Sequence, residues 1–149
     1  MTIKISSKNI TKEIKKKLQG AASKSSKAIK SQIVNIVVGQ YDKGVSPVKG
    51  FNKYKNYKKS TAKRKGRKSP VTLKETGKLH DSLTATQKSR DTITLGFKGS
   101  KNNKIAAFHQ FGTDNMDARP MLPTRGQKFK QGILNKISKI VKKELKNIK

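Results

Sequence analysis

The sequence predicts a single α+β domain in which two amphipathic helices flank a short antiparallel β-hairpin. Near both ends of the chain, apolar residues recur at three- and four-residue steps, as they do in helices that bury one face. Between these segments, one short stretch alternates apolar and polar residues, which is typical of a half-buried strand. The length of 149 residues fits one domain, and the absence of cysteine leaves packing as the source of stability.

The first predicted helix runs from Ser7 to Asp42. Its other face is rich in lysine, and its apolar stripe comprises Ile10, Ile14, Leu18, Ala22, Ile29, Ile33, Ile36 and Val37. Gly20 is a point at which the helix could divide into a short and a longer part. Gly44 is a suitable C-terminal stop because glycine readily adopts the left-handed conformation that ends helices.

A long basic loop or arm is predicted for residues 43–75. The helical periodicity disappears there, prolines and glycines interrupt the chain, and no acidic residue occurs before Glu75. Structureless segments of this length are uncommon inside compact domains and tend to be functional or disordered. We therefore expect either an arm that becomes ordered on a partner or a mobile insert.

The next part of the chain predicts a helical turn and a hairpin. The stretch KLHDSL at residues 78–83 has the character of a short helical turn. Two strands are then expected, from Leu83 to Lys88 and from Thr92 to Phe97, with the turn at residues 89–91. In the second strand Ile93, Leu95 and Phe97 would be buried and Thr92, Thr94 and Gly96 exposed.

The last third predicts a short helix or strand at residues 105–113, an extended segment and a final helix. Pro120 and Pro123 exclude a continuous helix through the middle of this region. The final helix is expected from Gln127 to Lys149, with an apolar stripe of Phe129, Ile133, Ile137, Ile140, Val141, Leu145 and Ile148.

The composition predicts a thin core and a requirement for anionic partners. Hydrophobic residues make up 32% of the chain, and 37 Lys and Arg against 8 Asp and Glu give a net charge of +29. Nucleic acid, an anionic membrane surface and acidic proteins would each compensate this charge. No apolar run has the length of a signal peptide or of a membrane span, so we expect a protein made and kept in the cytoplasm.

The densest basic cluster is the main candidate for partner or nucleic-acid contact. It comprises Lys53, Lys55, Lys58, Lys59, Lys63, Arg64, Lys65, Arg67 and Lys68. Phe51, Tyr54 and Tyr57 are interleaved with it, and lysines with aromatic side chains suit sequence-independent contact with nucleic acid. Docking on an acidic protein surface and simple solvation are the alternatives.

The sequence offers no convincing catalytic, cofactor or metal site. Gly77 and Lys78 lack the earlier glycine and the following Ser or Thr of a phosphate-binding loop. His80, Asp81 and Ser82 are adjacent, whereas triad members meet across a fold, so we expect surface or capping residues there. His109, between two phenylalanines, is expected to be partly buried with its polar atoms satisfied. Two histidines and few carboxylates do not form a metal site.

The order of five short motifs carries a family resemblance. They are SPVKG at 46–50, SPVTLKETGKLHDSL at 69–83, ITLGF at 93–97, AAFHQFGT at 106–113 and ARPMLP at 118–123. In order and spacing they resemble the tailed-bacteriophage virion-morphogenesis or tail-completion proteins, whose pattern is a TG.L..S element, a strand, an A..H..G segment and an RPFLP-like end before a final helix. The resemblance spans Gln40 to about Lys130, and the chain departs from it in its unusually high charge and lysine-rich terminal helices.

The resemblance implies a long N-terminal helix and a C-terminal helix packed on a small antiparallel sheet. It implies a non-enzymatic virion protein of the head–tail junction, without active site or cofactor, that pairs edge to edge in a ring of roughly six or twelve copies. Its partners would be portal, adaptor, stopper or tail proteins and the exiting genomic DNA, with no membrane. The matching residues, expected to be structural, are Thr76, Gly77, Leu79, Ser82, Ala107, His109, Gly112, Arg119, Pro120, Leu122 and Pro123.

Two rival functions remain open at this point. A freestanding, basic, sequence-independent nucleic-acid-binding protein would use the same lysines, and its affinity would fall steeply with salt. A nuclease is the second rival, but the sequence lacks the clustered carboxylates that metal-dependent phosphoryl chemistry requires.

Overall fold

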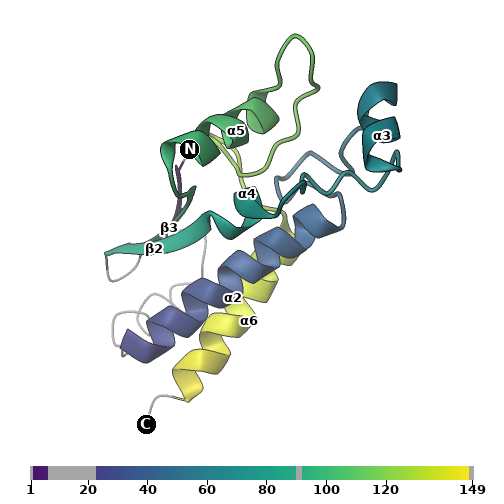
Figure 1. Cartoon of the computed structure of the whole chain (residues 1–149). Helices are drawn as coiled ribbons and strands as arrows, with labels where there is room; N and C mark the ends of the chain where they lie inside the picture. Colours follow the sequence, from purple (N-terminus) through teal and green to yellow (C-terminus); the bar gives the residue numbers. More distant parts are fainter. Residues whose placement is uncertain (1, 7–22, 90–91, 148–149) are drawn as a thin grey trace.

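The structure is a computed structural model that describes residues 2–6, 23–89 and 92–147. Its elements in chain order are β1 (Thr2–Ser6), α2 (Ser23–Asp42), α3 (Lys59–Lys65), α4 (Lys78–Asp81), β2 (Leu83–Ser89), β3 (Thr92–Phe97), α5 (Ser100–Phe111) and α6 (Gln131–Lys146). Helix α5 lies on one side of the sheet, and the α2–α6 pair lies on the other (Figure 1). The predicted α+β class is confirmed.

The sheet has three antiparallel strands with β3 in the centre, in the order β1-β3-β2. The predicted hairpin is formed by β2 and β3, which pair from Leu83 opposite Phe97 to Ser89 opposite Thr92. The other edge strand, β1, pairs with β3 from Thr2 opposite Gly96 and was not predicted. Its five residues form too short a run at the end of the chain to stand out by periodicity.

The central strand β3 is buried on both faces. Ile93, Leu95 and Phe97 are buried as predicted. Thr94 was expected on the solvent side but is buried too, because helices lie on both sides of the sheet. A strand covered on both faces loses the alternation that marks a half-buried one.

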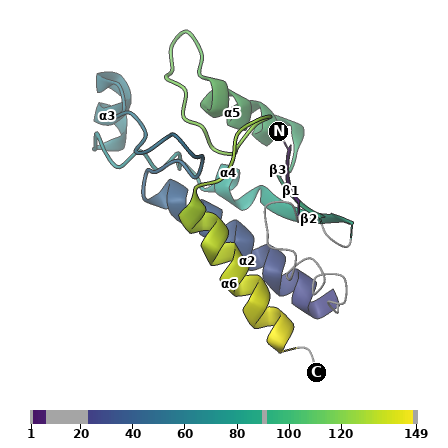
Figure 2. The same cartoon turned by 180° about the vertical axis from the view of Figure 1, so that it is seen from behind.

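Helices α2 and α6 lie side by side and supply much of the core (Figure 2). Helix α2 buries Ile29, Ile33, Val37 and Tyr41 at successive turns, and α6 buries Ile133, Ile137 and Val141. Each fully buried aliphatic side chain of this size contributes about 1.5–3 kcal/mol relative to exposure. The pair is also bridged by Gln32 Nε2, which donates to Glu144 Oε1 at 2.9 Å.

The long N-terminal helix is not confirmed over its full predicted length. Helix α2 matches its second part and ends as expected, where Gly44 adopts a φ of +68° and its N–H donates to the Tyr41 carbonyl at 2.9 Å. Residues 7–22, which include Ile10, Ile14, Leu18 and Gly20, lie outside the described residues. The end of the chain was predicted more closely, although α6 begins at Gln131 and not at Gln127. The later start follows from the bridge between Val48 and Phe129, which holds the preceding residues extended.

The expected extended arm at residues 43–75 is not confirmed either. This segment contains helix α3, an isolated bridge between Val45 and Lys53, and the bridge to Phe129. Its few apolar residues lack periodicity, but they enter the core, namely Val48, Tyr54, Ala62, Val71 and Leu73. Helix α3 projects at the edge of the molecule (Figures 1 and 2), so only part of the basic segment stands away from the body.

Buried hydroxyl groups hold the proline-containing segment at residues 119–122 in the centre of the fold. The Tyr41 hydroxyl donates to the Met121 carbonyl at 2.7 Å. Ser46 Oγ and the Tyr54 hydroxyl both donate to the Pro120 carbonyl, at 2.7 and 3.0 Å. Proline cannot donate a backbone hydrogen bond, so side chains from elsewhere fix this segment where a sheet or helix would otherwise do so.

Gln110 of α5 completes the set of hydrogen bonds to this segment. Its Oε1 accepts from the Met121 N–H at 2.8 Å and from the Leu122 N–H at 3.1 Å. Both donors are buried, so Gln110 satisfies two backbone groups that would otherwise be left without a partner.

Replacing Gln110 by methionine is expected to lower the free energy of unfolding by about 2–4 kcal/mol, because two buried N–H groups lose their acceptor. Chemical denaturation of the purified chain measures the loss. The control is Gln131→Met, which removes an exposed glutamine bonded to Asn135 and should change stability by less than about 0.5 kcal/mol. Equal losses in the two variants would contradict the role assigned to Gln110.

Gly112→Ala is expected to destabilise the chain by about 2 kcal/mol or more. Gly112 has a φ of +75° and a ψ of −179°, a region almost restricted to glycine, and an added Cβ would lie 2.8 Å from the Met116 carbonyl oxygen. Gly126→Ala is the control, since its φ is +82° but no atom lies within 4 Å of the added Cβ. Thermal unfolding should show the larger loss at Gly112, and a larger loss at Gly126 would contradict the steric account.

Candidate functional site

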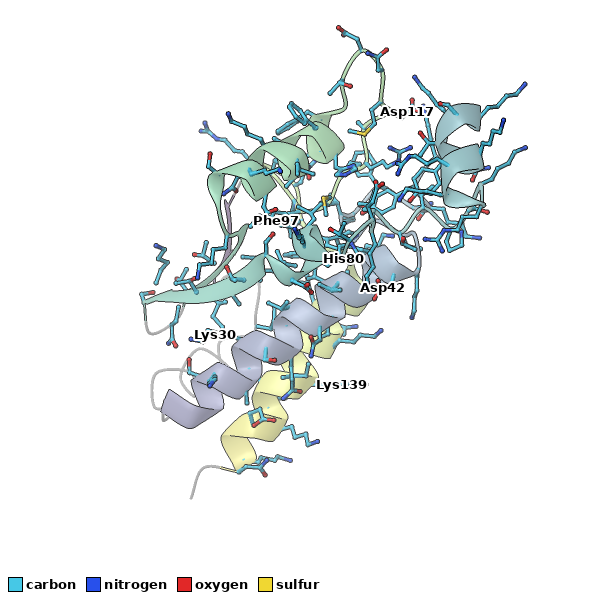
Figure 3. All side chains as sticks on the ribbon, viewed as in Figure 1. Lys30, Asp42, His80, Phe97, Asp117 and Lys139 are labelled. Atoms are coloured by element: carbon cyan, nitrogen blue, oxygen red, sulfur yellow. The ribbon has the colours of Figure 1, made fainter. Side chains whose placement is uncertain are left out.

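A cavity of about 1010 Å³ is present in the described part of the chain. It lies between α3, the segment around α4, helix α5 and the loop that follows α5. Figure 3 labels two of its lining residues, His80 from α4 and Asp117 from the loop. Four successive parts of the chain therefore meet around one space.

The residues that carry the family resemblance gather at this cavity. Those that line it are Thr76, Gly77, Leu79, Ser82, His109 and Arg119. The remaining ones do not line it: Ala107 is half-buried on α5, Gly112 ends α5, and Pro120, Leu122 and Pro123 are buried. Three motifs that are separate in sequence thus form one structural unit.

The first motif forms a compact turn that leads into β2. Gly77 has a φ of +86° and precedes α4. Ser82 ends α4, and its Oγ donates to the Leu79 carbonyl at 2.7 Å. The Ser82 carbonyl then accepts from the Lys98 N–H at 2.7 Å, which ties the turn to the end of β3.

The expectation of surface or capping residues is confirmed for Ser82, which caps α4, and is wrong for His80. Ser82 does cap a helix, but it is buried, and His80 is only 4% exposed. The reason is that α4 makes a single turn against the core, so that Leu79, His80 and Ser82 all point inward. Asp81 remains exposed, as expected.

The second and third motifs are joined by a tight reversal of the chain. After Gly112, the Thr113 N–H donates to the Met116 carbonyl at 2.9 Å, and the Met116 N–H donates back to the Thr113 carbonyl at 3.1 Å. The returning chain then passes close to α5, where the Arg119 N–H donates to the His109 carbonyl. This reversal places Arg119 against the inner wall of the cavity.

Arg119 is a buried cation without a carboxylate partner among the described residues. It is 5% exposed, and its Nε has no hydrogen-bond partner there. No carboxylate oxygen of the described residues lies within 4.0 Å of its guanidinium group, as the ion pairs found involve other residues. The Tyr57 ring, 5.7 Å from the guanidinium carbon, offers a cation–π contact.

Both histidines at the cavity have a pKa below the ordinary value for this side chain. Burial, and to a smaller extent the positive charge of Arg119, lower the pKa of His109 to about 4. Burial also lowers the pKa of His80, although Asp42, whose Oδ1 lies 3.6 Å from His80 Nδ1, opposes the shift. Neither ring nitrogen of His80 has a hydrogen-bond partner among the described residues, and the same holds for His109 Nδ1. His109 is partly buried as expected, but the expectation that its polar atoms are satisfied does not hold for Nδ1.

The cavity lining is strongly positive. Eight Lys or Arg residues line it, against Glu75, Asp81 and Asp117. Two of these acids are already paired, because Glu75 binds Arg64 and Lys65, and Asp117 binds Lys55 at 3.3 Å. The ion pair with Arg64 lowers the pKa of Glu75. The remaining charge attracts anions into a space that also has apolar walls, formed by Leu73, Leu79, Ile105 and Met116.

The predicted basic cluster divides into paired and unpaired residues. Lys55, Arg64, Lys65 and Arg67 contact Asp117, Glu75 or Thr72 within the chain. The members without an ion-pair partner among the described residues are Lys53, Lys58, Lys59, Lys63 and Lys68, all of which are exposed. Lys58, Arg64 and Lys65 also line the cavity.

The aromatic residues of this cluster are not an exposed stacking surface. Tyr54 is buried and bonded to the Pro120 carbonyl, and burial raises the pKa of its phenol. Tyr57 is partly buried against Lys65 and Arg119. Only Phe51 is exposed, so the interpretation that these aromatics stack on bases does not hold for Tyr54 and Tyr57.

A second surface feature is a pair of exposed phenylalanines on α5. Phe108 is 53% exposed and Phe111 is 68% exposed. They are three residues apart and therefore share one face of the helix. Large aromatic side chains with this exposure are typical of protein interfaces.

Other site types receive no support from the described residues. Within them, no group of three or more His, Cys, Asp or Glu side chains is arranged to hold a metal ion. None of the helices in the described part of the chain combines the length and the apolar character needed to cross a lipid bilayer.

Sequence reasoning missed the cavity itself and the burial of His80 and Arg119. Periodicity could not reveal them, because His80 lies in a helix of a single turn and Arg119 lies in an irregular segment. Gln110 was also missed, although a lone glutamine in the apolar stretch AAFHQF is a usable sign of a buried polar role.

The buried histidines predict a pH dependence of stability. The folded chain holds the pKa of His109 at about 4, and the unfolded chain returns it to 6.5, so the unfolded state binds more protons between these values. The free energy of unfolding should therefore fall by about 2–3 kcal/mol from pH 6.5 to pH 4 and then level off with respect to this group. Denaturant unfolding across this range measures it, and an unchanged slope in His109→Gln would contradict the assignment.

The comparisons with known proteins agree with the shared motifs. The model of the phage virion morphogenesis family matches residues 8–145, which is nearly the whole chain. No curated protein and no solved structure gives a significant match. The matched range contains helices α2 to α5, all of α6 except its last residue, the hairpin and all residues described above as lining the cavity. The chain therefore belongs to the phage virion morphogenesis family.

Proposed function

We propose that the chain is a ring-forming subunit of the phage neck, which completes the head–tail junction and helps to line or seal the passage of DNA. The observation that carries this proposal is the family match over residues 8–145, since a virion-morphogenesis protein builds the particle. The family points to a structural role in place of a catalytic one. Its neighbours would be copies of itself and portal, adaptor, stopper or tail proteins.

The exposed phenylalanines on α5 support a role in assembly. Phe108 and Phe111 place apolar surface in water on a chain whose net charge is +29. Burying both rings in an interface would recover part of the cost of their exposure. We assign this face of α5 to the contact between neighbouring copies in the ring, where like-charged lysines would otherwise keep the copies apart.

The basic residues around α3 would then contact a neighbouring ring or the genome. The five lysines without an ion-pair partner are exposed, and helix α3, which carries Lys59 and Lys63, stands at the edge of the molecule (Figure 1). Mobile lysine charges suit both phosphates and acidic protein surfaces. In a neck ring, the sheet and the helix pair would form the wall, and α3 would extend from it.

A sequence-independent nucleic-acid-binding protein is the second candidate. The same exposed lysines favour it, because sequence-independent binding rests on phosphate contacts. The two candidates differ in what the chain does without nucleic acid: a neck subunit assembles, whereas a nucleic-acid-binding protein needs DNA or RNA to do so.

Purified full-length chain, free of nucleic acid, is expected to form rings in negative-stain images and to sediment as an oligomer. Phe108→Ser/Phe111→Ser should shift it to smaller species without lowering its melting temperature, because both rings are exposed. Phe51→Ser is the control, as this phenylalanine is also exposed but is not part of α5. A chain that remains monomeric alone but assembles on duplex DNA would favour the second candidate.

Loss of the gene from the phage is expected to leave filled heads and tails that do not join, and the wild-type chain supplied in trans should restore particles. Electron microscopy of lysates and mass spectrometry of purified virions measure both effects. Normal particles without the chain, or its absence from wild-type virions, would refute the proposed function.

A further inference from the structure

We propose that the cavity is a docking site for an acidic segment of a partner protein, in which a carboxylate of that segment binds the buried guanidinium of Arg119. The inference rests on the proposed function only for the source of the segment, which would be a neighbouring protein of the junction. The binding chemistry itself follows from the residues that line the cavity.

Arg119 carries a buried positive charge that the described residues compensate only in part. A cation that is 95% withdrawn from solvent is costly unless an anion compensates it. The described residues supply none within ion-pair distance, and the Tyr57 ring compensates the charge only in part. A carboxylate from outside the chain would complete the site, and the planar guanidinium group suits it well.

The surrounding polar groups point to the same ligand chemistry. His80 is 96% buried, lines the cavity, and has two ring nitrogens without a hydrogen-bond partner among the described residues. A neutral imidazole offers one N–H donor. Farther out, Lys78 and Lys101 line the cavity, and neither has an ion-pair partner among the described residues. The charge of the lining is thus arranged with a buried cation inside and exposed lysines around it.

The shape of the site favours a polypeptide over a nucleic acid. Its volume of about 1010 Å³ is at the upper end of the range of ligand pockets, and apolar side chains share the walls with the cations. A flexible acidic segment can place a carboxylate at Arg119 and apolar side chains against Leu73, Ile105 and Met116. The phosphates of a stiff duplex stay on a wide cylinder, so they would reach the exposed lysines of the lining but not Arg119, a residue that is only 5% exposed.

Binding of a short fluorescent peptide, with glutamates alternating with leucines, tests the proposal on the full-length chain at physiological salt. Fluorescence anisotropy should give saturable binding, and the same peptide with glutamine in place of glutamate should bind at least about tenfold more weakly. The double variant Lys78→Gln/Lys101→Gln should weaken binding about three- to tenfold.

The matched control is Lys139→Gln/Lys142→Gln, which removes the same charge from the exposed face of α6. It should leave the affinity for the peptide within about twofold of wild type, because these lysines do not line the cavity. Equal weakening by the two double variants would show general charge attraction only and would overturn the proposal. The same variants are also tested with a short DNA duplex. If Lys78→Gln/Lys101→Gln lowers the affinity for DNA more than it lowers the affinity for the peptide, the proposal is overturned in favour of a nucleic-acid site.

Arg119→Met separates a binding role from a structural one. If Arg119 awaits an external carboxylate, an apolar side chain of similar length should abolish peptide binding and leave the melting temperature of the free chain unchanged or higher. A large drop in melting temperature would show that Arg119 serves the fold, and unchanged peptide binding would show that it is not the anchor. Either result would overturn the proposal without touching the neck assignment, which depends on ring formation and on the composition of the virion.

Discussion

The hydrogen bonds to the backbone of residues 119–122 are the constraint on which most of this structure depends. Tyr41 from α2, Ser46 and Tyr54 from the following segment, and Gln110 from α5 all bond to this short stretch. The chain has a low apolar content, so a few buried polar contacts from distant elements do much to define how those elements pack. The same contacts fix the position of Arg119, which immediately precedes the anchored carbonyls. Stability and the candidate site therefore share one set of interactions.

This arrangement explains why motifs of separate elements meet at one cavity. The turn around Gly77 supplies one wall, α5 supplies a second, and the reversal after Gly112 returns the chain beneath α5. Some residues of the family pattern therefore line the cavity, and others are buried and support the fold. His80 and Arg119 are exceptions to good packing, because other side chains at these two positions would make an isolated monomer more stable. Such exceptions are typical of functional sites.

The sequence predicts regular elements far better than it predicts this site. Helix α6 and strand β3 were predicted because their apolar residues repeat with a clear period. Segment 43–75 was not, since Val48, Tyr54, Val71 and Leu73 enter the core one at a time from irregular backbone. The burial of His80 and Arg119 depends on how α4 and the loop after α5 pack, which only the tertiary structure shows. Several residues of the family resemblance line the cavity, but the resemblance gave no indication that a cavity exists.

High positive charge and exposed aromatic surface have a common explanation in assembly. A chain with a net charge of +29 repels its own copies, so contacts between copies need apolar surface, and contacts with other components can use the charge. The central claim is that the chain is built into the head–tail junction with its cavity occupied by a neighbour. Cryo-electron microscopy of the intact particle tests it most directly: the map should show a ring of this chain in the neck, with polypeptide density beside each Arg119. A neck without this chain, or a ring whose cavities hold only solvent, would contradict the account.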